Sequence, residues 1–191
     1  SPGRGAERDA LLARWMEGRM GHRELTIAEC ALMRVREDEA VAFALGHTID
    51  PGFHGFVREA RGRGDVVMVV SEGFDFYVRL LLGRAGLDDV ETRANRARFE
   101  GDAVRAEFPH ADGSCTAACG NCKAQHVRAR REAGFRTVMV GDGLSDRCGA
   151  RAADRVVARG SLLAWCAGHG VPAEPFHDFS ELAARARADA A

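Results

Sequence analysis

The chain has 191 residues, of which 46% are hydrophobic, and its formal net charge is -1 at pH 7. This length is enough for one domain with a small appended subdomain. The near-neutral net charge provides no excess of positive charge that would attract nucleic acid. No apolar run is long enough to cross a membrane, and no signal peptide is recognisable, so we expect a cytoplasmic protein. In that compartment the six cysteines indicate free thiols or a metal site rather than a disulfide framework.

The first part of the chain carries apolar residues at helical spacing. Three such stripes occur between residues 6 and 45, formed by Leu11, Leu12, Trp15 and Met16, by Leu25, Ala28, Ala31, Leu32 and Val35, and by Ala40, Val41, Ala44 and Leu45. They predict two or three amphipathic helices. We assign residues 1–48 to a small helical subdomain, separated from the remainder by the turn at Asp50-Pro51-Gly52.

Helices and apolar strands alternate over residues 49–191, which predicts an α/β core with a parallel sheet. The expected strands are 66–70, 137–140 and 155–158, and the expected helices are 53–60, 74–84, 124–133, 147–153, 161–167 and a last one opening at residue 180. Residues 90–108 interrupt this rhythm with alternating apolar positions around Glu100-Gly101-Asp102. They predict an antiparallel hairpin at the margin of the sheet.

Two carboxylates follow the strand predicted at Thr137 to Val140. Asp142 lies in the turn Gly141-Asp142-Gly143, and Asp146 lies about one helical turn further on. Open α/β sheets bind ligands at the carboxyl ends of their strands, and hard oxygen ligands suit Mg²⁺. The alternative is ordinary turn chemistry, with Asp146 capping the next helix.

A hydroxyl and an ammonium are expected at the same edge. Ser71 follows the strand predicted at 66–70, and Lys123, which starts a helix, is the only lysine among 27 basic residues. A compact ammonium and an arginine are not interchangeable at a phosphate. Ser71 and Lys123 would donate to phosphate oxygens while the aspartates hold Mg²⁺, which is the equipment of phosphoryl transfer.

Three segments resemble motifs two, three and four of the haloacid dehalogenase superfamily of phosphatases. They are Val70 to Phe74, Gly120-Asn121-Cys122-Lys123 and Gly141 to Asp146. Within this superfamily the chain is similar to the phosphoserine phosphatase-like branch. Ile49 to Phe53, Gly73 to Tyr77, Phe108 to Asp112 and Gly141 to Arg147 resemble the group that contains the enol-phosphate phosphatase of methionine salvage. The resemblance covers about residues 6–182.

The resemblance implies a Rossmann-like parallel sheet with a small helical cap, to which residues 1–48 correspond. It also implies Mg²⁺-dependent hydrolysis of a small phosphorylated metabolite through an aspartyl-phosphate. Ser71, with Glu72 and Gly73, would bind the phosphate, and Lys123 would steady the phosphate and the nucleophile. Asp142 and Asp146 would bind Mg²⁺ directly or through water.

The first motif of the superfamily, a hydrophobic strand ending in Asp-x-Asp, has no counterpart before residue 48. Asp9 is the nearest acid, but it lies in a helical segment. The missing strand would occupy the middle of the sheet and would carry the nucleophile. We expect an upstream segment of the gene product to supply it. The alternative is a relative without a nucleophile, which binds phosphorylated ligands and Mg²⁺ without turning them over.

The cysteines offer rival functions. Cys115-x-x-x-Cys119-x-x-Cys122 has the spacing of the iron-sulfur motif of radical enzymes that cleave S-adenosylmethionine. The same three residues could instead form a Cys₄ zinc site with Cys148. The third interpretation is a set of reduced thiols in the loop before Lys123.

Overall fold

The computed structural model describes residues 2–188 and has an α/β fold. The chain forms two compact units: the first contains residues up to 47, 70–81 and 92–121, and the second contains 48–69, 82–91 and the residues from 122 onward. A division into domains at residue 48 stays a prediction. Among the described residues, no helix has the length and apolar character needed to cross a membrane.

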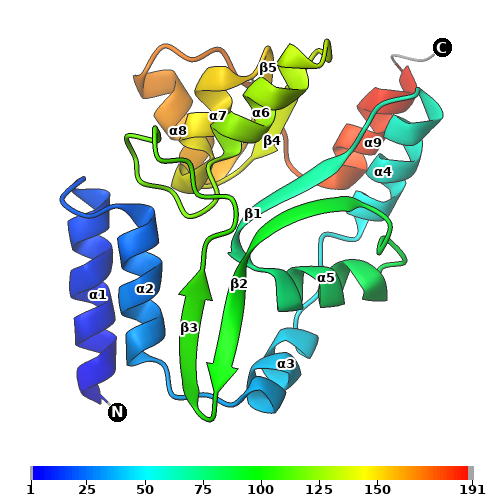
Figure 1. Cartoon of the computed structure of the whole chain (residues 1–191). Helices are drawn as coiled ribbons and strands as arrows, with labels where there is room; N and C mark the ends of the chain where they lie inside the picture. The colour runs from blue at the N-terminus through cyan, green and yellow to red at the C-terminus, as the bar shows by residue number, and fades with distance from the viewer. Residues whose placement is uncertain (1, 189–191) are drawn as a thin grey trace. The chain divides into compact units, whose positions relative to one another are not determined.

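The first unit begins with three helices, as the apolar stripes predict. They are α1 (Pro2–Met16), α2 (His22–Leu32) and α3 (Glu37–Leu45), and Figure 1 shows α1 and α2 side by side. Leu25 and Cys30 of α2 are buried. The N-terminus of α2 is held by the loop before α6, because the N–H groups of His22 and Arg23 donate to the carbonyls of Ala117 and Ala118.

One sheet has the order β1-β2-β3, formed by β1 (Met68–Phe74), β2 (Glu91–Glu100) and β3 (Ala103–Glu107). The hairpin prediction is confirmed, because β2 and β3 are antiparallel with Phe99 opposite Val104. The prediction for the preceding strand is wrong at both ends: β1 starts at Met68 rather than Val66 and continues to Phe74, so Ser71 lies inside the strand. Helix α5 (Asp75–Arg84) follows it directly.

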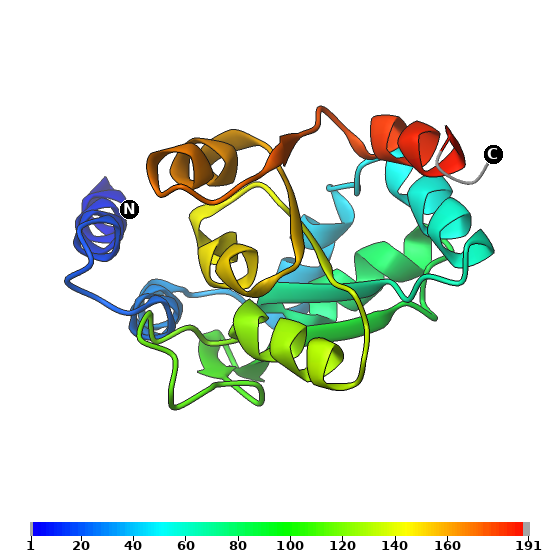
Figure 2. The ribbon, with the colours of Figure 1, turned by 90° about the horizontal axis from the view of Figure 1, so that it is seen from above.

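In the second unit, α4 (Gly52–Gly62) and α9 (Phe179–Ala188) lie side by side in both views (Figures 1 and 2). The rings of Phe53 and Phe56 contact that of Phe179. Asp50 joins the two helix starts, since its carboxylate accepts from the N–H groups of Gly52 at 2.8 Å and Phe179 at 3.2 Å. These contacts fix the two helices against each other.

The other sheet, with the order β4-β5-β6, also belongs to the second unit. It contains β4 (Val138–Gly141), β5 (Arg155–Ala158) and the short β6 (Glu174–Pro175), all parallel, with Val140 opposite Val157. Helices α6 (Lys123–Glu132), α7 (Arg147–Ala152) and α8 (Gly160–Gly168) and a 3₁₀ turn, η1 (Leu144–Asp146), complete it. A core of buried side chains contains Ala150, Val156, Ala158, Leu162 and Cys166. The pattern of the sequence did not predict β6, because two exposed residues carry no periodicity.

Strand β4 lies at the end of its sheet although its sequence is that of a central strand. It is an apolar run without alternation, which is typical of a strand flanked on both sides. In the described part of the chain, β5 is its one strand partner, and Val138 is 53% exposed. The edge of β4 away from β5 therefore has no hydrogen-bonded strand partner among the described residues.

Candidate functional site

The turn after β4 directs the Asp146 side chain back toward the strand. Asp146 Oδ2 accepts from the backbone N–H groups of Asp142 and Gly143, each at 3.0 Å. A Cβ atom at Gly141 would lie 2.5 Å from the same oxygen, so the strand must end in glycine. Asp146 stands at the N-cap position of α7, as the alternative predicts, but its side chain makes no capping hydrogen bond to that helix. Its carboxylate instead accepts from the N–H of Gly143 at the start of η1.

Lys123 and Asp146 form a buried ion pair within the second unit. Lys123 Nζ donates to Asp146 Oδ1 and lies 3.4 Å from Ser145 Oγ. Lys123 is only 8% exposed and Asp146 only 5%. Helix α7 approaches the start of α6 closely here, since a Cβ at Gly149 would lie 3.0 Å from Lys123 Cβ. One ammonium is thus held rigidly at the carboxyl end of β4.

Asp142 is the accessible acid of the turn. Its side chain is 63% exposed, and Oδ2 lies 3.7 Å from an Arg159 nitrogen. Its carbonyl accepts from the N–H of Leu162 at 3.1 Å, so the start of α8 holds its backbone. Arg159 also lies over the Phe176 ring and donates to the carbonyl of His177. Its position close to Asp142 was not anticipated, because only tertiary packing brings α8 to this turn.

These two aspartates fit Mg²⁺ as a partial ligand set. Asp142 has an exposed carboxylate that can bind a cation directly. Both oxygens of Asp146 already accept hydrogen bonds, from Lys123 and from the turn, so this residue is suited to a contact through water. An octahedral site needs further oxygens besides these.

In the first unit, Ser71 and Gly73 form a tight local arrangement at the end of β1. Ser71 Oγ accepts from the N–H of Gly73 at 3.0 Å. A Cβ at Gly73 would lie 1.5 Å from the Tyr77 hydroxyl oxygen, so only glycine fits there. Burial raises the pKa of Tyr77, against the smaller effect of a hydrogen bond to the Phe74 backbone.

The carboxylate of Glu72 is buried and contacts other groups of the first unit. It is 7% exposed, and Oε2 accepts from the N–H groups of Gly120 and Asn121 and lies 3.1 Å from His22 Nδ1. A phosphate contact at this position would therefore use the backbone. Asn121 reinforces the same corner, because its amide donates to the carbonyls of Ser71 at 2.8 Å and Arg93 at 2.9 Å.

A second buried amide, Asn95, donates to the carbonyl of Glu72 at 2.7 Å. Sequence reasoning assigned no individual role to Asn95, Asn121 or His22. A polar residue at an inward position of an alternating strand was the available signal for Asn95. The structure thus brings Lys123, Asp142 and Asp146 together in the second unit, and Ser71, Glu72 and Gly73 in the first. That one phosphate contacts Ser71 and Lys123 stays a prediction.

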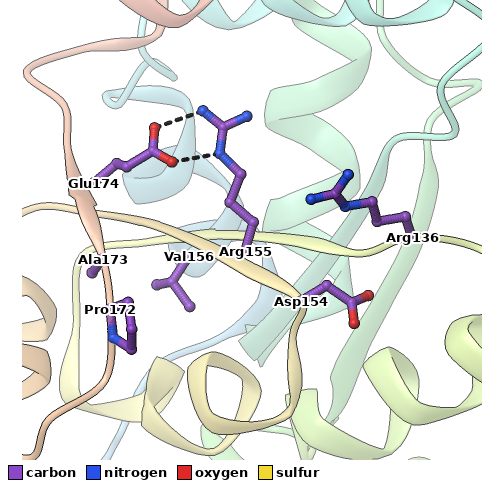
Figure 3. Close-up of a pocket in the computed structure, with 7 residues that line it drawn as sticks. All are labelled: Arg136, Asp154, Arg155, Val156, Pro172, Ala173 and Glu174. Carbon is purple, nitrogen blue, oxygen red and sulfur yellow. Dashed lines mark hydrogen bonds and ion pairs between the residues drawn. The ribbon is translucent and has the colours of Figure 1, made fainter.

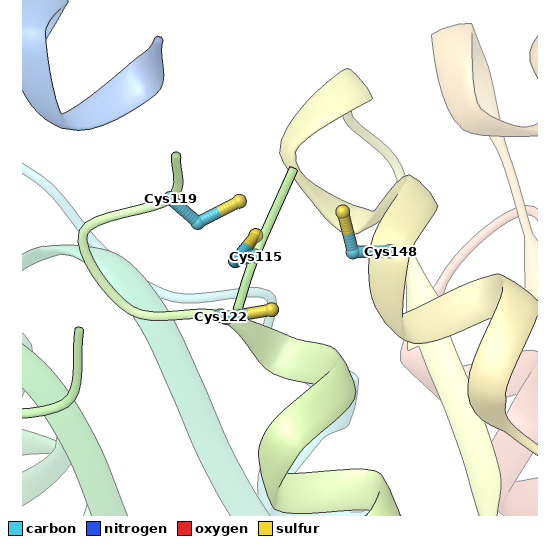
Figure 4. A group of neighbouring side chains, drawn as sticks. All are labelled: Cys115, Cys119, Cys122 and Cys148. Atoms are coloured by element: carbon cyan, nitrogen blue, oxygen red, sulfur yellow. The ribbon is translucent and has the colours of Figure 1, made fainter. Parts of the chain in front are cut away.

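Two cysteines of the candidate metal site belong to the first unit and two to the second, and Figure 4 draws all four. In the first unit the sulfur atoms of Cys115 and Cys119 lie within 4.8 Å of each other, and in the second unit those of Cys122 and Cys148 do. No disulfide joins any of the six cysteines. Cys122 immediately precedes Lys123, and Cys148 lies two residues after Asp146.

A surface hollow of about 530 Å³ lies at the other end of the second sheet (Figure 3). It is lined by Arg136, Asp154, Arg155, Val156, Pro172, Ala173 and Glu174, which lie near the amino ends of β4 and β5. Arg155 donates to both oxygens of Glu174 at 2.6 Å, and Asp154 forms an ion pair with Arg131 at 3.0 Å. Within the second unit it lies at the opposite end of β4 from Asp142 and Asp146.

With this fold and these residues in place, the class of protein is defined. The sequence model of the haloacid dehalogenase-like hydrolase family matches residues 3–151, and the chain belongs to this family. Relatives named 2-hydroxy-3-keto-5-methylthiopentenyl-1-phosphate phosphatase are similar to it. The protein from Exiguobacterium sibiricum is 35% identical over 135 residues, which is 70% of this chain and 61% of the relative. The protein from Geobacillus kaustophilus is 38% identical over 133 residues, 69% of this chain and 60% of the relative.

The chain therefore spans about 60% of the length of these relatives. Solved structures agree on the fold. A phosphoserine phosphatase with a phospho-aspartyl intermediate analogue superposes with a TM-score of 0.69 at 22% identity, over 93% of this chain and 83% of that one. The phosphoserine phosphatase from T. onnurineus gives 0.67 at 19% identity, over 96% and 82%. The expected family and fold class are confirmed.

Proposed function

We propose that this chain is the larger part of a Mg²⁺-dependent phosphatase that hydrolyses a small phosphomonoester through an aspartyl-phosphate. The observation that carries the proposal is the buried Lys123–Asp146 pair beside the exposed carboxylate of Asp142 at the carboxyl end of β4. The names of the relatives support an enol phosphate with a methylthiopentenyl chain as the substrate class.

In this proposal each residue has a separate task. Ser71 Oγ and the backbone N–H groups near Gly73 donate to the phosphate oxygens, and Lys123 neutralises their charge. Asp142 binds the metal directly and Asp146 through water, while Asp146 also fixes Lys123. Bound Mg²⁺ would stabilise negative charge on the phosphoryl group during its transfer.

The nucleophile is proposed to lie in a segment outside this chain. No Asp-x-Asp sequence occurs among the 191 residues. The open edge of β4, with its exposed Val138, supports a further parallel strand at this place. A carboxylate at the end of that strand would attack phosphorus, the bond to the leaving oxygen would break, and a second aspartate would give that oxygen a proton. Water would then hydrolyse the acyl phosphate.

Phosphate release from p-nitrophenyl phosphate tests the proposal. The present chain is compared with an extended protein that carries the natural upstream sequence. We expect background release from the chain alone and Mg²⁺-dependent turnover from the extended protein. Lys123→Arg is the matched variant, since it keeps the charge in a chain that uses arginine elsewhere. Turnover by the chain alone, or full activity of Lys123→Arg, contradicts the proposal.

The absence of Asp-x-Asp also favours a second candidate, a relative that binds phosphorylated ligands and Mg²⁺ without turnover. Calorimetric titration of the extended protein with Mg²⁺ and inorganic phosphate distinguishes the two. Binding without phosphate release from any phosphomonoester would replace the first candidate by the second.

A further inference from the structure

Four of the six cysteines belong to the candidate metal site, and Cys30 and Cys166 do not. Cys30 and Cys166 are buried singly, and burial raises the pKa of Cys30 to about 11, with the charge of Glu29 as a smaller cause. Such thiols act as small apolar side chains. Cys115 and Cys119, and likewise Cys122 and Cys148, instead hold their sulfur atoms within 4.8 Å of each other. Two close pairs of thiols require an explanation.

The loop of the first unit is shaped so that it presents Cys115 and Cys119 together. A turn joins them, since the N–H of Ala118 donates to the carbonyl of Cys115 at 2.9 Å. Ala118 has a φ of 45°, a left-handed conformation that is strained for a non-glycine residue. Asp112 fixes the start of the loop by accepting from the N–H and the hydroxyl of Ser114. A strained loop of this kind is stabilised when its side chains bind a common ligand.

The pair of the second unit comes from two packed helices. Cys122 stands at the N-cap of α6, and Cys148 lies in the first turn of α7. The close approach of the two helices at Gly149 brings these residues together. Figure 4 shows all four side chains on their elements.

Coordination of a metal accounts for this spacing better than a disulfide does. Zinc–sulfur bonds of about 2.3 Å in a tetrahedron place the sulfur atoms about 3.8 Å apart, so pairs within 4.8 Å reach this geometry by small side-chain rotations. A disulfide needs a separation of about 2.05 Å, a much larger movement. Cys119 and Cys122 are buried, so a metal held by their sulfur atoms would be shielded from water.

We propose that Cys115, Cys119, Cys122 and Cys148 bind one zinc ion as a closed, structural Cys₄ site. This role is independent of phosphate hydrolysis, because four protein ligands leave no position for water or substrate. For the phosphatase, the bound zinc would hold Lys123 and Asp146 in position. Cys122 adjoins Lys123 and Cys148 lies two residues from Asp146, so the metal would fix both ends of the buried ion pair.

Metal content tests the proposal directly. The chain is expressed with zinc in the medium, purified under reducing conditions and dialysed, and its metals are measured by mass spectrometry. We expect one zinc per chain, released completely by a mercurial that modifies thiols. Cys148→Ser and Cys119→Ser should lose most of the zinc, while the matched variant Cys166→Ser should keep it. Zinc below a tenth of the chain concentration overturns the proposal, as does stoichiometric zinc in Cys148→Ser.

Binding of Co²⁺ by the wild-type chain tests the same site without any substitution, so it still decides the question if a variant fails to fold. Wild-type chain freed of zinc is titrated with Co²⁺, and four thiolates predict intense thiolate-to-cobalt charge transfer with the visible bands of tetrahedral coordination. Bands typical of octahedral coordination, or no bands, contradict the site. A brown protein carrying iron and sulfide after anaerobic purification also contradicts it, because it would assign the cysteines to an iron-sulfur cluster.

Discussion

The buried pair of Lys123 and Asp146 permits a prediction that requires no substrate, metal or further segment. Lys123→Met leaves a buried carboxylate without its cation, and Asp146→Asn leaves a buried ammonium without its anion. Removing one member of a buried pair costs roughly 3–5 kcal/mol of unfolding free energy. In Lys123→Met the Asp146 carboxylate keeps its two backbone donors, and in Asp146→Asn the Lys123 ammonium keeps Ser145. We therefore expect each variant to lose unfolding free energy at the lower end of this range, about 3 kcal/mol.

The double variant Lys123→Met/Asp146→Asn contains neither buried charge. It should therefore lose about 3 kcal/mol rather than the sum of about 6 kcal/mol. Urea unfolding followed by circular dichroism measures the three differences, and the melting temperature of a single variant should fall by roughly 6–12 °C. If the two losses add within about 0.5 kcal/mol, the side chains are not coupled and the ion pair is not a feature of the folded protein.

Three further predictions concern the turn after β4 and the loop before α6. In the extended protein, Asp142→Asn should lower Mg²⁺-dependent phosphate release at least about 100-fold with little effect on unfolding, and an unchanged rate would show that this acid does not bind the metal. Gly141→Ala should destabilise the chain by about 1–3 kcal/mol in urea unfolding, because its Cβ would lie 2.5 Å from Asp146 Oδ2, and a neutral effect would contradict the observed turn. Burial, followed by the charges of Arg93 and Arg96, lowers the pKa of His110 from 6.5. The unfolded chain thus binds more protons near that pH, and the contribution of His110 to stability is full above pH 6.5 and falls as the pH decreases below it. His110→Gln should flatten the fall in stability between about pH 7 and 5, and an unaltered slope would contradict the assignment.

The secondary structure was largely predictable because local signals agree with the tertiary fold. Apolar spacing located the helices of residues 2–45, and glycines marked where several elements end. The run Thr137 to Val140 and the strand Arg155–Ala158 were found within one residue. Strand β1 was displaced, because the polar and glycine residues 71–73 resemble a loop while sheet pairing keeps them extended. Intrinsic strand preference is weaker than this tertiary context.

The candidate site was predictable in its residue types but not in its contacts. Glycines flanking Asp142, and a single lysine among many arginines, identified the second-unit residues. Whether Asp146 caps a helix or turns back to bind Lys123 depends on the path of the 3₁₀ turn, which no spacing rule specifies. The buried network of Glu72, Asn95 and Asn121 likewise joins residues up to 49 positions apart, so only the folded chain reveals it.

The central claim is that Ser71 and Lys123 act on one phosphoryl group that Asp142 links to Mg²⁺. The most direct measurement is a crystal structure of the extended protein with Mg²⁺ and beryllium fluoride, which mimics an aspartyl-phosphate. We predict the mimic on an aspartate of the added segment, with Ser71 Oγ and Lys123 Nζ within hydrogen-bonding distance and Mg²⁺ bound to Asp142. A mimic contacted by neither Ser71 nor Lys123, or a metal away from Asp142, would contradict the account.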